Sequence, residues 1–167
     1  IIEKVVEMTR PRWRDIPQSN GLTRALETEL APDISELAGI ESEIREALTN
    51  LVLNAVDAMP NGGKITLRTR ALRQNNFGKY PRQIGVEICD TGTGMNEETR
   101  KRCLEPFFST KGKRGTGLGL AMVYGVIKRH EGTIDIQTEP GKGTTFHLSF
   151  PVRSNLCKSP DEEDNTH

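Results

Sequence analysis

The chain has 167 residues, and its 23 lysines and arginines balance 23 aspartates and glutamates, so the formal net charge at pH 7 is zero. This length suits one domain with a sizeable core, and the neutral balance argues against nucleic acid as the main partner. No apolar run approaches the ~20 residues of a membrane span, and no signal-peptide pattern opens the sequence.

The three cysteines form no C-x-x-C pair, which favours a reducing compartment over a disulfide or zinc framework. We therefore expect a cytoplasmic domain with no direct membrane contact. Because the sequence starts at Ile1 and not at Met, we also expect a piece of a larger protein, whose parent could be membrane-anchored.

The first sixty residues predict a helix, a strand and a second helix. Apolar residues at positions 1, 2, 5, 6 and 8 predict a helix that Pro11 ends. Residues 21–30 read as a strand. Residues 41–59 form the clearest helix, because one face of its helical wheel is apolar and carries Ile44, Leu48, Leu51, Ala55 and Met59.

Two β-hairpins are predicted in the rest of the chain. Residues 64–72 and 83–90 alternate as strands around a polar loop, and we expect Cys89 to pack in the core. Residues 132–138 and 144–150 form the second hairpin. Between the hairpins lies a short helix over 96–104, with Asn96 as its N-cap. Residues 153–167 read as a polar, disordered tail or linker after a domain of residues 1–152.

The polar face of the helix over 41–59 is unusual in composition. Glu46, Asn50, Asn54 and Asp57 stand in one row. A solvated helix face is the ordinary interpretation, but such faces collect Lys, Glu and Arg, and Asn is a poor helix former. Asparagine offers a neutral carbonyl oxygen that suits Mg²⁺ while leaving room for phosphates and water. We therefore favour a functional role for this row of side chains over the solvated face.

A second candidate site follows the strand over 83–90. Asp90 leaves an apolar strand and begins the pattern Asp90-x-Gly92-x-Gly94. An ordinary turn is one interpretation. The other is a part-buried carboxylate that accepts a hydrogen bond from an adenine amine, with Gly92 and Gly94 removing side chains that would block the purine.

The third candidate is the glycine-rich stretch over residues 115–120, GTGLGL, which precedes an apolar helix. A helix start with unpaired N–H groups suits phosphate oxygens. The spacing fits neither the dinucleotide fingerprint nor the P-loop. Upstream, Phe107 and Phe108 are expected to anchor a mobile segment, and residues 109–117 have the cations and glycines of a lid.

Together these patterns resemble the boxes of one family. Residues 46–55 resemble the N box, 90–94 the first glycine box, 105–111 (EPFFSTK) the F box, 115–120 the second glycine box, and 141–146 a third. The set is similar to the ATP-binding catalytic domain of bacterial sensor histidine kinases, in the superfamily that includes gyrase, Hsp90 and MutL. The match covers nearly the whole chain.

The resemblance implies a two-layer α/β sandwich (the Bergerat ATP-binding fold): a mixed, mostly antiparallel sheet with helices on one face. It implies ATP and Mg²⁺ as cofactors, with Asn54 and Asn50 holding the metal. Asn50 and Lys111 are the implied catalytic residues. The implied nucleotide contacts are Asn50, Asn54, Asp57, Asp90, Gly92, Gly94, Met95, Thr110, Lys111, Gly115, Thr116, Gly117, Leu118, Gly119, Leu120 and Thr144.

Transfer of phosphate is favoured over hydrolysis. Hydrolytic relatives such as gyrase carry a water-activating Glu four residues before the magnesium-binding Asn. This sequence has Asn50 there, and an amide cannot act as a general base. The resemblance thus implies transfer of the γ-phosphoryl group to a histidine, and any role for Glu46 is open.

The acceptor histidine and its partners lie elsewhere. His130, His147 and His167 lack the neighbours of an acceptor box, and we interpret His130 as structural. The implied partners are a phosphoacceptor domain outside this sequence and a downstream response regulator. A nucleotide-gated clamp of the gyrase and Hsp90 type, or a serine kinase of the anti-sigma type, remain the alternatives.

Overall fold

The computed structural model describes residues 1–15, 21, 23–32, 34, 36–72, 83–110, 112 and 115–152. The helices are α1 (Ile2–Arg10), the π-helical turn η1 (Pro11–Asp15), α3 (Glu41–Asp57), α4 (Glu97–Arg102) and α5 (Gly119–Arg129). The strands are β1 (Arg24–Glu29), β2 (Gly63–Leu72), β3 (Gln83–Asp90), β4 (Thr133–Glu139) and β5 (Gly143–Pro151). These elements match the predicted ones closely in type and position.

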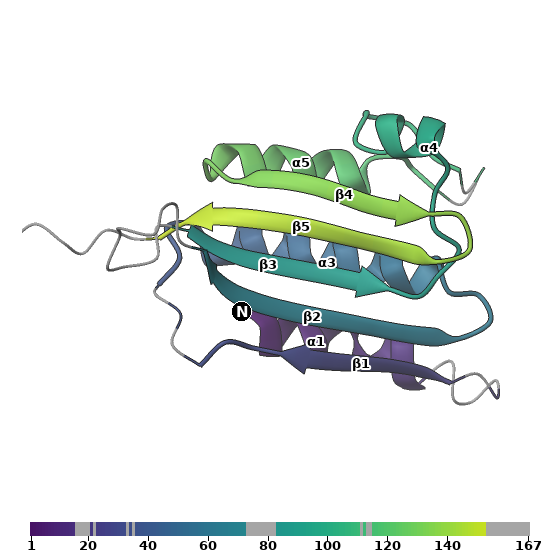
Figure 1. Cartoon of the computed structure of the whole chain (residues 1–167), viewed down its shortest axis with the longest axis horizontal. Coiled ribbons are helices and arrows are strands. Elements are labelled where there is room, and N and C mark those ends of the chain that lie inside the picture. The colour runs from purple at the N-terminus through teal and green to yellow at the C-terminus, as the bar shows by residue number, and fades with distance from the viewer. Residues whose placement is uncertain are drawn as a thin grey trace, which may run out of the picture.

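The strands form one mixed sheet in the order β1-β2-β3-β5-β4. β1 runs parallel to β2, and the other neighbours are antiparallel, including both predicted hairpins. The helices α1, α3 and α5 all lie on one face of the sheet (Figure 1). The expected two-layer α/β sandwich is confirmed.

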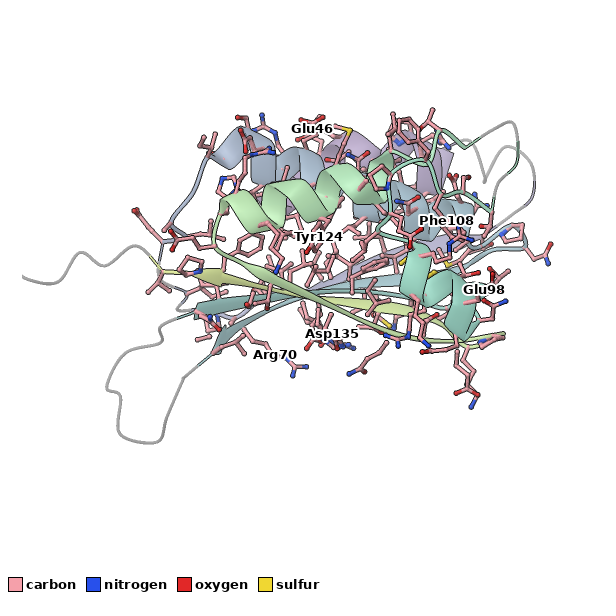
Figure 2. All side chains as sticks on the ribbon, turned by 90° about the horizontal axis from the view of Figure 1, so that it is seen from above. Glu46, Arg70, Glu98, Phe108, Tyr124 and Asp135 are labelled. Atoms are coloured by element: carbon pink, nitrogen blue, oxygen red, sulfur yellow. The ribbon has the colours of Figure 1, made fainter. Side chains whose placement is uncertain are left out.

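The two faces of the sheet differ because side chains alternate along each strand. Ile65, Ile88 and Phe146 point toward the helices and are buried. The other face is polar, and none of the described helices lies over it; Arg70 and Asp135 project from it away from the helices (Figure 2). Cys89 shares this outer face and is only half-buried, so the prediction that it packs in the core was wrong.

The central helix of the layer is α3, which packs between α1 and α5. Its predicted apolar face is fully buried: Ile44, Leu48 and Leu51 are each at most 1% exposed. Fully burying side chains of this size contributes about 1.5–3 kcal/mol each. The polar row on the opposite face is therefore held in place by a packed core.

His130 has the structural role that the sequence suggested. It is buried at the end of α5, and its Nε2 accepts a hydrogen bond of 3.0 Å from the backbone N–H of Ile40. Its Nδ1 lies 2.8 Å from the carbonyl oxygen of Val126 and therefore donates. Both ring nitrogens are used, so this histidine ties the start of α3 to α5 and is not available as a phosphate acceptor.

Pro11 ends α1 as predicted, whereas Phe107 behaves differently from its prediction. Pro11 closes the α-helix, but the chain continues in the π-helical turn η1. Phe107 was expected to anchor its segment, yet its side chain is 77% exposed and its φ is +66°. Phe108 alone packs down, with its ring centroid 4.4 Å from the Arg102 guanidinium carbon.

No helix in the described part of the chain combines the length and apolar composition that crossing a bilayer requires. The predicted tail, residues 153–167, lies outside the described residues, as does the loop over 73–82.

Candidate nucleotide-binding site

A cavity of about 430 Å³ lies between α3, the ends of β3 and β5, and the segment that joins α4 to α5. Its volume falls in the range of small-molecule sites, ~300–1,000 Å³. Three walls enclose it. The strand wall is Asp90, Thr93, Gly94, Thr144 and Phe146. The helix wall is Asn50, Leu53, Asn54 and Asp57. The loop wall is Phe108, Ser109, Thr110, Gly115, Thr116 and Gly117.

Asp90 is the buried carboxylate of the strand wall. It is only 4% exposed, and its Oδ1 accepts a hydrogen bond of 2.8 Å from the backbone N–H of Gly92. Burial raises the pKa of Asp90 above its usual value, while hydrogen bonds from the backbone of Gly92 and Thr144 act in the opposite direction. A carboxylate held in this way can accept a further hydrogen bond from a ligand in the cavity.

Gly94 lines the cavity and Gly92 does not, and the idea that these glycines leave room for a purine stays a prediction. Both glycines also allow segments of the chain to approach one another closely. A Cβ on Gly92 would collide with the carbonyl oxygen of Ala58, and one on Gly94 with that of Glu139. Gly143 is of the same kind, because a Cβ there would collide with the carbonyl oxygen of Asp90.

Three members of the polar row form the helix wall, and the fourth does not. Asn50, Asn54 and Asp57 line the cavity. Glu46 is exposed and projects from the side of α3 that faces away from the sheet (Figure 2). The amide nitrogen of Asn54 lies 3.9 Å from where a Cβ on Gly119 would stand. The asparagine row thus meets the first residue of α5.

The loop wall ends at the N-terminus of α5. The helix begins at Gly119, inside the glycine-rich stretch that the sequence placed before it, and its N-cap Leu118 makes no side-chain cap hydrogen bond. The first N–H groups of α5 therefore receive no hydrogen bond from the N-cap side chain. The start of this helix lies at the edge of the cavity, whose lining there is Gly115, Thr116, Gly117, Gly119 and Leu120. This arrangement favours a negatively charged group at that end of the cavity.

The cavity unites nearly all the residues expected to contact a nucleotide. Gly92 and Leu118 are described but do not line it, and Lys111 lies outside the described residues. Met95 lines it as expected. Residues that the sequence did not suggest also line it, including Arg12, Leu53, Thr93, Thr99, Cys103 and Phe108. Leu53, Thr93 and Phe108 lie inside predicted boxes, whereas Arg12 belongs to no motif.

The fold and the cavity agree with what the chain resembles among known proteins. Residues 39–154 match the family described as "Histidine kinase-, DNA gyrase B-, and HSP90-like ATPase". The chain belongs to this family.

The similar proteins are sensor kinases. Sporulation kinase E of Bacillus subtilis is 36% identical over 146 residues, which are 87% of this chain and 19% of that protein. A mycobacterial sensor histidine kinase, MprB, has a TM-score of 0.73 at 26% identity and covers 91% of this chain and 92% of that one. The full-length ShkA, solved in complex with AMPPNP, also has a TM-score of 0.73, at 25% identity over 90% of this chain and 29% of that chain.

These matches make the chain an ATP-binding catalytic domain of the histidine kinase type. It spans only a minor part of the curated relatives that it matches, so the activity and partners of the whole protein are taken up below as proposals.

Proposed function

We propose that this domain binds Mg²⁺-ATP in the three-walled cavity and donates the γ-phosphoryl group to a histidine on a phosphoacceptor domain outside this sequence. The observation that carries the proposal is the placement of two unlike groups in one cavity. A buried carboxylate, Asp90, stands on the strand wall, and the Asn54 amide stands beside the N-terminus of α5.

The strand wall supports adenine as the base. Asp90 can accept a hydrogen bond from the exocyclic amine of adenine, whereas guanine would present an oxygen to the same carboxylate. Two acceptors facing each other in a buried site cost about 1–3 kcal/mol. Thr144, which is 6% exposed and lies opposite Asp90 in the β3–β5 register, would close the cavity on the other side of the base.

The helix wall fits a magnesium ion that is bound together with phosphates. Among the described residues there is no cluster of three or more His, Cys, Asp or Glu side chains that could hold a metal by themselves. Asn50 and Asn54 instead offer neutral oxygens to an ion that takes its other ligands from phosphates and water. When bound, Mg²⁺ would neutralise charge on the transferring phosphoryl group.

Transfer to a histidine requires a nucleophile from outside the cavity. A ring nitrogen of the acceptor would attack the γ-phosphorus, the bond from that phosphorus to the bridging oxygen would break, and ADP would leave. Asn50 lines the cavity where hydrolytic relatives carry Glu. It can position groups but cannot remove a proton from water, which supports transfer over hydrolysis. A response regulator would then receive the phosphoryl group from the histidine.

The test combines the domain with γ-labelled ATP, Mg²⁺ and a helical hairpin that carries the acceptor histidine of a related sensor kinase. We expect acid-labile, base-stable label on the hairpin and little free phosphate. Steady ATP hydrolysis without labelled histidine would contradict the proposal, and acid-stable label would point to a serine kinase. A hairpin with its histidine replaced by glutamine is the matched control.

A further inference from the structure

One cationic side chain lines the cavity without belonging to any predicted box. Among the described residues that line the cavity, Arg12 is the only lysine or arginine. It comes from η1, the π-helical turn that follows α1, far in sequence from the other lining residues. Turns of this kind occur frequently at functional sites.

The backbone at Arg12 is held in place by the next residue in the chain, Trp13. Trp13 is 8% exposed and packs in the hydrophobic core, so η1 is tied to the body of the domain. Arg12 points instead to α3, where its Nη2 lies 3.3 Å from Oδ1 of Asp57. The two side chains are 53% and 37% exposed. Ion pairs this exposed are weak, so the guanidinium can exchange its partner at little cost.

The helix wall shows which part of a nucleotide Arg12 would meet. Asn54 lies at the N-terminus of α5, the phosphate end of the cavity. The next residue after Asp57, Ala58, accepts a hydrogen bond of 2.9 Å from the N–H of Thr93, beside the Asp90 end. Along α3, Asp57 therefore lies between the two ends, and Arg12 is paired with it there. A nucleotide that spanned the cavity would bring its ribose and the attached phosphate to this level.

We propose that Arg12 is a phosphate ligand, which leaves Asp57 when a nucleotide enters and binds the phosphate nearest the ribose. This inference rests on the proposed nucleotide site. A guanidinium matches a phosphate well because two of its N–H groups can donate in parallel. Asp57 then acts as the partner that holds the arginine over the empty cavity.

A simpler role for Arg12 must be distinguished from this one. The arginine could merely neutralise Asp57, whose charge would otherwise repel the phosphates. In that case, once the charge of Asp57 is removed, the loss of Arg12 would no longer weaken nucleotide binding. If Arg12 contacts phosphate directly, its removal weakens binding whether or not Asp57 carries a charge.

The experiment measures the affinities of ATP, AMP and adenosine for the wild-type protein and for Arg12→Gln by calorimetry and, for weak ligands, by NMR titration. We expect Arg12→Gln to bind ATP and AMP about tenfold more weakly, as the loss of one charged hydrogen bond implies, and to bind adenosine as the wild type does. Arg14→Gln, in the same turn but exposed and outside the cavity lining, is the matched control and should bind all three normally.

The affinities of the same three ligands are then measured with Asp57→Asn and with Asp57→Asn/Arg12→Gln. We expect the tenfold loss for AMP to persist between these two variants. Loss of the effect in the Asp57→Asn background, an equal loss for adenosine, or a loss for ATP without one for AMP would each overturn the assignment. Unchanged affinities in Arg12→Gln would also overturn the assignment of Arg12 while leaving the proposed function intact. A wild-type protein that binds no nucleotide would contradict both the assignment and the proposed function.

Discussion

The strand wall and the loop wall both line the cavity, yet they are built by different means. In the strand wall, backbone atoms of several segments interlock: Gly141 donates to the carbonyl oxygen of Thr93 at 2.7 Å, and Met95 donates to the hydroxyl of Thr138 at 2.9 Å. That hydroxyl also donates to the carbonyl oxygen of Gly143 at 3.1 Å. Every partner belongs to a strand or to a turn beside one.

In the loop wall, the described hydrogen bonds join residues of the single segment between α4 and α5. Phe107 donates to the carbonyl oxygen of Gly117 at 2.9 Å, and both residues have positive φ values, +66° and +68°. The aromatic ring of Phe107 is nevertheless exposed, and Leu118 is 37% exposed. Phe108 is half-buried.

The difference indicates a division of labour between the walls. Selecting one base requires acceptors and donors that do not move, because a rigid buried site makes a mismatched ligand costly. Under the proposed function, the phosphate end would have to release ADP and admit the acceptor histidine, which a less rigid wall allows. Substitutions in the strand wall should therefore affect folding or the affinity for the base. Substitutions at the phosphate end should affect the binding of the phosphates and the metal.

The largest effect is expected from Gly143→Ala. Gly143 has φ +94°, and a Cβ there would collide with the backbone of Asp90. We expect the free energy of unfolding to fall by about 3 kcal/mol or more, because backbone must move to make room. Urea denaturation measures it. Gly141→Ala is the matched control, since its φ is +79° but open space surrounds it, and it should lose only about 1–2 kcal/mol. Equal losses would argue against an interlocked strand wall.

Asp90→Asn should have the next largest effect, on affinity and not on folding. The carboxylate accepts from the backbone of Gly92 and Thr144, and an amide has only one oxygen to offer to these donors and to the adenine amine. We expect ATP affinity to fall about 100-fold, measured by calorimetry with circular dichroism to verify the fold. Asp135→Asn, on the outer face of the sheet, is the control (Figure 2). Unchanged ATP affinity in Asp90→Asn would contradict the assignment of Asp90 as the residue that binds adenine.

Asn54→Ala should have a smaller effect that depends on the metal. Because the amide oxygen is a proposed Mg²⁺ ligand, we expect ATP affinity to fall about tenfold with Mg²⁺ and little in EDTA. Glu46→Ala is the control, since it stands in the same row of α3 but outside the cavity lining. If Asn54→Ala lost the same affinity with and without Mg²⁺, the metal role would be wrong.

The sequence by itself determined the elements and most of the cavity. The apolar stripe of α3 fixes which side of that helix faces the sheet, so the polar row of Asn50, Asn54 and Asp57 had to face away from the core. The alternation in β3 fixes Asp90 on the same side as Ile88, toward the helices. Local periodicity was sufficient in both cases because burial of the apolar side chains overrides other preferences.

Tertiary structure alone decided the rest. That Gly92, Gly94 and Gly143 let backbone segments approach so closely depends on segments that meet only after folding. Phe107 and Phe108 are adjacent and identical in type, yet one is exposed and the other packs, because the positive φ of Phe107 turns the chain between them. Arg12 carries no local signal, since its place in the cavity follows from the packing of η1 against α3. Contacts between residues far apart in sequence leave no periodic pattern to read.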